Sequence, residues 1–132
     1  MDFEIRFNFE KSDPGGHYVR GWASVVSEGG KPVEDWQGDV IGMDELRKAA
    51  HGYVTRARVA KAMHQGDQVG QVVESVIIDD AFAKAHGITH DKRGWWIGMQ
   101  VHDASVQKRV ASGELKAFSI GGKGKRKKME AC

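Results

Sequence analysis

Two short segments of this chain carry side chains that together could perform acyl transfer. His64 closes a basic stretch in Ala62-Met63-His64, and Ser119 stands in Phe118-Ser119-Ile120-Gly121-Gly122 near the C-terminus. A serine hydroxyl is a poor nucleophile at neutral pH unless a neighbouring base removes its proton. The pair therefore predicts a covalent acyl-enzyme, with Ser119 as the nucleophile and His64 as the general base.

The surroundings of the two residues leave several points open. Ser119 is expected at the end of a strand, where the glycines that follow it would let a substrate backbone come close. Two internal acids, Glu74 and Asp67, are candidates for a third member that orients the imidazole. The alternatives are ordinary ones: a serine that bonds its own backbone, a partly buried histidine and solvated carboxylates.

The histidines also raise the question of a metal site. His86 and His90 have an i,i+4 spacing that could share an ion on a helix, but Gly87 between them disfavours a helix there. The chain has no His-Glu-x-x-His motif, and its single cysteine is Cys132. We expect neither a metal nor a cofactor.

Composition favours one folded domain. The chain has 132 residues, of which 40% are hydrophobic and 29% charged, and its mean hydropathy is -0.50. These values are typical of a globular protein, and no apolar run reaches the ~20 residues of a membrane span. We expect a single domain over residues 1–122, no membrane association and, because no secretory signal opens the chain, a cytoplasmic location.

The last ten residues form a basic tail. The net charge of the whole chain is only +2, so charge alone does not predict nucleic-acid binding. The basic residues cluster directly after the glycines: Lys123, Lys125, Arg126, Lys127 and Lys128. This tail, residues 123–132, is either solvated or able to meet phosphate or an acidic protein, and nucleic acid is the less favoured partner.

The hydrophobic periodicity predicts more strands than helices. Period-two alternation or β-branched runs predict strands over residues 2–10, 18–26, 69–78, 95–101 and 115–120. Capping residues and 3.6-residue spacing predict helices from residue 43 onward, over 79–87 and over 104–112. The first helix should bury Leu46, Ala49, Ala50 and Tyr53 and turn basic residues as far as Lys61 to solvent. The predicted class is α+β, with a small, mostly antiparallel, partly closed sheet flanked by helices.

The order of several motifs resembles that of a known family. The segments that carry the resemblance are Gly21-Trp22-Ala23-Ser24-Val25, Asp35-Trp36-Gln37-Gly38-Asp39-Val40-Ile41, Glu45-Leu46-Arg47-Lys48-Ala49-Ala50, Met63-His64, Gly70-Gln71-Val72-Val73-Glu74-Ser75, Gly94-Trp95-Trp96-Ile97-Gly98 and Phe118-Ser119-Ile120-Gly121-Gly122. Together they resemble the prohead proteases of tailed bacteriophages, in particular the branch found in Bacillus-type prophages. No single segment is specific, but the ordered set spans most of the chain.

The resemblance implies a fold, an activity and partners. The fold would be like that of the herpesvirus capsid-maturation protease, a β-barrel surrounded by helices. The protein would act inside the assembling procapsid in the host cytoplasm, cleaving scaffold, the N-terminal region of the major capsid protein and then itself, with a homodimer as one option. In that family a segment after the serine strand also contributes to the site, and from the resemblance we expect this segment to be missing here, because the sequence ends at Cys132.

Three explanations of that early end remain open: a truncated chain, a degenerate or split gene product, or an internal acid in the missing role. Two other functions also remain open. One is a catalytically inactive scaffold or assembly module with the same fold, and the other is a small nucleic-acid-associated domain that uses the basic tail.

Overall fold

A long hairpin opens the fold of this protein. The computed structural model describes residues 2–34, 40–56, 59–61 and 68–123. Strands β1 (Asp2–Ser12) and β2 (Tyr18–Glu28) pair antiparallel across the turn, which confirms the strands predicted over residues 2–10 and 18–26. Gly21 lies where the two backbones come close, because a Cβ there would stand 2.8 Å from the Cα of Phe9. This close approach explains why a glycine occupies the position.

The turn of the hairpin is fixed by one carboxylate. Asp13 accepts a hydrogen bond from the backbone N–H of Tyr18 at 2.7 Å and lies 3.4 Å from the His17 Nδ1. The N–H of Tyr18 is the main cause that lowers the pKa of Asp13, and His17 adds to it. Both side chains are exposed to solvent, so the pair orients the turn and adds little to global stability.

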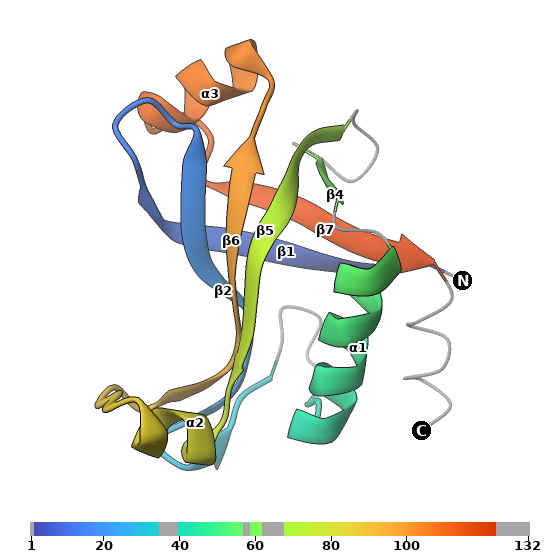
Figure 1. Ribbon diagram of the computed structural model, residues 1–132, viewed down its shortest axis with the longest axis vertical. Helices are drawn as coiled ribbons and strands as arrows, with labels where there is room; N and C mark the ends of the chain where they lie inside the picture. Colours follow the sequence, from blue (N-terminus) through green and yellow to red (C-terminus); the bar gives the residue numbers. More distant parts are fainter. Residues whose placement is uncertain (1, 35–39, 57–58, 62–67, 124–132) are drawn as a thin grey trace.

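Strands and helices alternate irregularly after the hairpin (Figure 1). The remaining strands are β3 (Lys31–Pro32), β4 (Val59–Lys61), β5 (Gln68–Ile78), β6 (Lys92–Val101) and β7 (Ala117–Lys123). The helices are α1 (Met43–Arg56), α2 (Asp80–Ala85) and α3 (Ala104–Ala111). Both short helices begin after an aspartate cap, since Asp79 and Asp103 each accept a hydrogen bond from a backbone N–H of the first turn.

All strands belong to one curled antiparallel sheet. Their order is β1-β7-β4-β5-β6-β2-β3, and β1 pairs with β2 as well as with β7. The first strand thus joins both sides of the sheet, and β1 and β7 cross behind β2, β6 and β5 in Figure 1. This arrangement confirms the predicted α+β class with an antiparallel, barrel-like sheet flanked by helices.

Three details of the sheet differ from the sequence prediction. Residues 31–32 form the short strand β3, although the prediction for this region was a loop. Helix α1 ends at Arg56, and Lys61 belongs to β4 instead of the helix. A three-residue strand is too short to show a period, and it is held by pairing with β5 on one side and β7 on the other.

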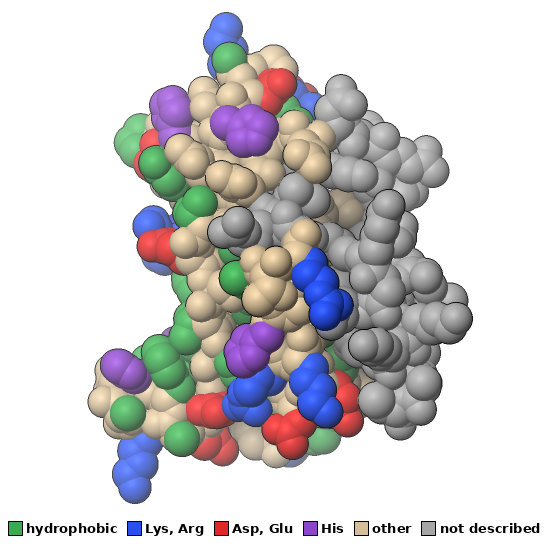
Figure 2. Space-filling model, turned by 45° about the vertical axis from the view of Figure 1, so that its right-hand side comes forward, with side chains coloured by type: hydrophobic (Ala, Val, Ile, Leu, Met, Phe, Trp, Pro, Cys, Tyr) green, Lys and Arg blue, Asp and Glu red, His purple; other side chains and the backbone are tan. Residues whose placement is uncertain are grey.

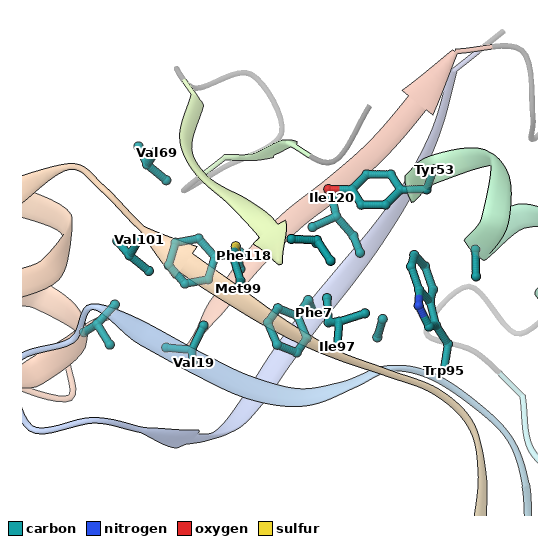
Figure 3. Close-up of a cluster of buried hydrophobic side chains, with 14 of the residues drawn as sticks. Phe7, Val19, Tyr53, Val69, Trp95, Ile97, Met99, Val101, Phe118 and Ile120 are labelled. Carbon is teal, nitrogen blue, oxygen red and sulfur yellow. The ribbon is translucent and has the colours of Figure 1, made fainter. Parts of the chain in front are cut away.

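The main core fills the concave side of the curled sheet (Figure 3). Phe7, Trp95 and Ile97 are 0% exposed, and Phe118 and Ile120 are 1% exposed. Helix α1 covers this core with its predicted face, because Leu46, Ala49, Ala50 and Tyr53 are all buried. The ring of Tyr53 meets that of Trp95 edge-on, with centroids 5.7 Å apart, and burial raises the pKa of the Tyr53 hydroxyl.

A second, smaller cluster packs on the convex side of the sheet. Trp22, Ile78 and Ala83 are buried there, and α2 covers them. Trp96 joins this cluster through an edge-on contact with Trp22 at 5.3 Å, whereas its neighbour Trp95 lies in the main core. The two tryptophans therefore point to opposite faces of β6, as the alternation of a strand predicts.

An ion pair spans the middle of the convex face. Arg20 on β2 and Glu74 on β5 are both in register with Gly98 on the strand between them. The Arg20 Nε donates to Glu74 Oε1 at 2.7 Å, and Nη2 donates to Oε2 at 3.3 Å. A Cβ at position 98 would collide with the Glu74 carboxylate. The glycine thus leaves the space in which the two side chains meet.

The solvent side of α1 is charged and mixed in sign. Acidic and basic side chains lie next to one another on the face of the molecule that carries this helix (Figure 2). Arg47 bonds Asp44 at 3.0 Å within the helix and Asp79 at 2.8 Å next to α2. Of the helices the structure describes, none combines the length and the apolar character needed to cross a membrane.

We expect Phe118→Ala to lower the free energy of unfolding by about 3–5 kcal/mol, because it removes a fully buried ring from the main core. Chemical denaturation followed by circular dichroism measures the change. Val73→Ala is the control, since Val73 is 49% exposed and its truncation should change stability by less than about 0.5 kcal/mol. Equal effects of the two substitutions would contradict the placement of Phe118.

Because the Glu74 side chain occupies the space next to Gly98, the effect of Gly98→Ala on the free energy of unfolding should depend on the residue at position 74. Gly98→Ala should lower the free energy of unfolding by about 1 kcal/mol, since the added carbon displaces the Glu74 carboxylate. In a Glu74→Ala background the same substitution should cost much less. A double-mutant cycle in urea measures the coupling, and an identical cost in both backgrounds would show that Glu74 does not occupy this space.

Candidate active site

Ser119 lies in the interior of a strand and points away from the core. Its neighbours Phe118 and Ile120 are buried in the main core and point inward in Figure 3. Because side chains alternate along a strand, Ser119 faces the convex side of the sheet. The residue is partly exposed, so solvent reaches the hydroxyl side of β7.

The prediction that Ser119 ends its strand is wrong. The strand β7 begins at Ala117, two residues later than predicted, and continues through Lys123. Gly121 and Gly122 pair with Glu4 and Phe3 of β1. Glycine usually weakens a strand, but here the ladder to the eleven-residue β1 carries the strand through both glycines.

Small residues flank Ser119 along its own strand. Positions i-2 and i+2 share its face, and they are Ala117 and Gly121. Within the part of the chain that the structure describes, no hydrogen bond engages the Ser119 hydroxyl. The described structure therefore does not support the alternative of a serine whose hydroxyl bonds its own backbone.

Basic residues occupy the positions directly across from Ser119 on both neighbouring strands. Arg6 of β1 is its partner in one ladder, and Lys61 of β4 is its partner in the other. The sequence gives no signal for this arrangement, because Arg6 and Ser119 are 113 positions apart and only the register aligns them. The arrangement depends on the pairing of both β1 and β4 with β7, and β4 was not predicted.

His64 and Asp67 lie outside the described residues. Their segment, residues 62–67, connects β4 with β5, and the two described ends pair with each other through Lys61 and Gln68. Since Lys61 is also the partner of Ser119, this connection leaves the sheet from the strand next to the serine and re-enters it on β5, one strand further away.

Glu74, the other candidate for a third member, lies elsewhere on the sheet. It is on β5, six residues beyond Gln68, which corresponds to about 20 Å along the strand. Its carboxylate is occupied by Arg20. The structure does not bring Glu74 and Ser119 together.

His86 and His90, the two histidines considered as a metal pair, do not lie on one helix. His86 is the C-cap of α2 and stacks on Phe82 at 4.2 Å, and His90 meets the ring of Trp22 at 5.6 Å. Gly87 between them has φ +68°, which ends the helix. Among the described residues, no three histidine, cysteine or acidic side chains lie close enough to share a metal ion.

Comparisons with known proteins address the family. Two proteins of Bacillus subtilis (strain 168) are similar to this chain: the uncharacterized protein YqbD, 34% identical over 90 residues, and the phage-like element PBSX protein XkdF, 30% identical over 91 residues. The aligned parts cover 67% and 68% of this chain but only 27% and 32% of the relatives. The chain thus spans about a third of the length of these curated relatives.

No solved structure matches the chain, so the likeness to the herpesvirus protease fold remains an expectation of the resemblance. A family model described as "Putative phage serine protease XkdF" matches residues 11–128. This match includes α1, the connection between β4 and β5, and all of β7 with Ser119. The chain belongs to this XkdF family of phage serine proteases.

Proposed function

We propose that this protein is a peptide hydrolase in which Ser119 is the nucleophile and His64 the general base. The observation that carries the proposal is the setting of Ser119 described above. The residue stands on the convex face, between Ala117 and Gly121, and its hydroxyl has no partner among the described residues. A serine placed in this way is open to a substrate and free to be deprotonated.

Chain connectivity supports His64 as the base. Directly paired antiparallel residues have Cα atoms about 5 Å apart, so Lys61 lies next to Ser119. His64 follows Lys61 by three residues, and three residues span at most about 11 Å. The Cα of His64 is therefore confined to within about 16 Å of the Cα of Ser119, a limit that includes hydrogen-bond contact of the two side chains.

The proposed reaction has two halves. The Ser119 oxygen attacks the carbonyl carbon of the scissile bond while His64 takes the hydroxyl proton, and the C–N bond then breaks as the imidazolium returns that proton to the leaving amine. Water next attacks the resulting ester while His64 accepts one of its protons. The bond between the Ser119 oxygen and the acyl carbon then breaks as the imidazolium returns that proton to the serine oxygen, which releases the carboxylic acid and the free serine.

Of the two acids considered, we propose Asp67 as the third member. It directly precedes Gln68, which pairs with Lys61, so the same connection carries both Asp67 and His64. Glu74 is distant along β5 and already paired with Arg20. A carboxylate close to the imidazole would hold its tautomer and favour its charged form.

The setting we propose for this activity is maturation of a phage procapsid in the host cytoplasm. The substrates would be scaffold, the N-terminal region of the capsid protein and the protease itself. Two copies of the protease would associate as a homodimer. Membership in a phage serine protease family and the name of one relative, a phage-like element protein, support this setting. The ordered motifs quoted above support the maturation role.

Labelling with a fluorophosphonate tests the nucleophile. Ser119 should form a covalent adduct detected by mass spectrometry, and Ser119→Ala should abolish it because the substitution removes the proposed nucleophile. Ser105→Ala is the matched control and should label as the wild type does. Folded protein that resists the reagent would instead support the catalytically inactive scaffold module. An adduct on another serine would contradict Ser119 as the nucleophile.

The role of the base is tested by the rate of the same labelling. His64→Gln should slow it by about 10²–10⁴-fold, the usual contribution of a general base. His86→Gln is the control, because His86 lies at the end of α2 on the convex cluster, and its rate should stay at the wild-type value. Equal rates for the two variants would remove His64 from the mechanism.

A further inference from the structure

Arg6 shares the face and the level of Ser119. It is the direct register partner of Ser119 in the β1–β7 ladder. On either side of it, Phe7 is buried and Ile5 packs against the main core, whereas Arg6 itself is exposed. Directly opposed side chains of an antiparallel pair have Cβ atoms about 4.5–5.5 Å apart. The long arginine side chain can therefore place its guanidinium beside whatever is bound at the Ser119 hydroxyl.

The charge of Arg6 has no counterpart in the described part of the chain. The arginines 20, 47, 93 and 109 each pair with a carboxylate, but no described acidic side chain pairs with Arg6. Lys61 occupies the opposite register position on β4. Both strands next to Ser119 thus bring a basic residue to its level, and the flanking Ala117 and Gly121 add no charge.

We propose that Arg6 makes this site selective for a substrate with a carboxylate side chain next to the scissile bond. The inference deepens the proposed function and rests on Ser119 being the nucleophile. A guanidinium offers a planar, permanently charged pair of donors that matches a carboxylate. Since no acidic side chain among the described residues neutralises Arg6, we expect its guanidinium to bind an acidic residue of the substrate.

Arg6 lies outside the part of the chain that the family model matches. The match begins at residue 11, so all of β1 except its last two residues lies outside it. The serine and the connection that carries the proposed base lie inside it. The matched region would then supply the chemistry, and β1 would supply the preference for an acidic residue.

A binding experiment tests the subsite without catalysis. In Ser119→Ala protein, N-acetylglutamate N-methylamide should bind about tenfold more tightly than N-acetylglutamine N-methylamide, the effect of one charge-assisted hydrogen bond. An NMR titration should shift the Arg6 Nε–H resonance with the glutamate probe. Arg6→Gln should abolish the preference, Arg6→Lys should keep part of it, and the charge-matched control Lys84→Gln should keep all of it.

The outcomes separate this inference from the proposed function. Equal affinity for the two probes, or no shift of the Arg6 resonance at the solubility limit of the glutamate probe, would overturn the subsite even if Ser119 reacts with fluorophosphonate. A glutamate preference that depends on Arg6 in a protein that resists fluorophosphonate would keep the binding site and remove the hydrolase.

The reacting enzyme gives a second, kinetic readout. The p-nitrophenyl ester of N-acetylglutamine and that of N-acetylglutamate should differ by about tenfold in kcat/KM, in favour of glutamate. Arg6→Gln should remove the difference by slowing only the glutamate ester, whereas a purely structural role would slow both esters alike. Retention of the glutamate preference in Arg6→Gln would contradict the assignment.

Discussion

The antiparallel ladder between β1 and β7 is the interaction on which the rest of this structure depends. It runs from Asp2 opposite Lys123 to Asn8 opposite Ala117, and it joins the first described strand to the last. Because β1 also pairs with β2, the same strand closes the curl of the sheet. Without this ladder, the concave side that buries Phe7 and Phe118 would be open.

The register of this ladder decides what the surface of the protein can do. Alternation puts Phe118 and Ile120 into the core and leaves Ser119 on the opposite face. A slip by one residue would bury the serine and expose the two apolar side chains. The register of this ladder therefore determines both which side chains enter the hydrophobic core and which way Ser119 faces. Because burial of Phe118 and Ile120 stabilises this register, it also fixes the orientation of Ser119.

Local sequence patterns predicted the elements whose signals are local. The alternation in β1, the buried face of α1, the capped helices α2 and α3 and the opposed Trp95 and Trp96 all follow from periods or end signals within about a dozen residues. The strand β4 and the last residues of β7 could not be predicted in this way. They are strands because β5, β7 and β1 offer them partners, and such partners are invisible to a local period.

The candidate site likewise contains residues that local sequence could predict and relations between residues that it could not. Ser119, His64 and Asp67 could be named from residue type and from the resemblance, because they lie in recognisable segments. The distance of Glu74 from the serine and its bond to Arg20 required the register of three strands. The neighbourhood of Arg6 required a ladder between residues more than a hundred positions apart.

The order of the strands along the chain has a consequence for the timing of the site. The strand β7 follows every other described strand in the sequence, so the ribosome makes Ser119 only after both of its flanking strands. Until β7 docks between β1 and β4, the serine has neither a fixed orientation nor a basic neighbour. On the proposed mechanism, a nascent or incompletely folded copy would lack the arrangement around Ser119, and activity would begin only after assembly of the sheet is complete.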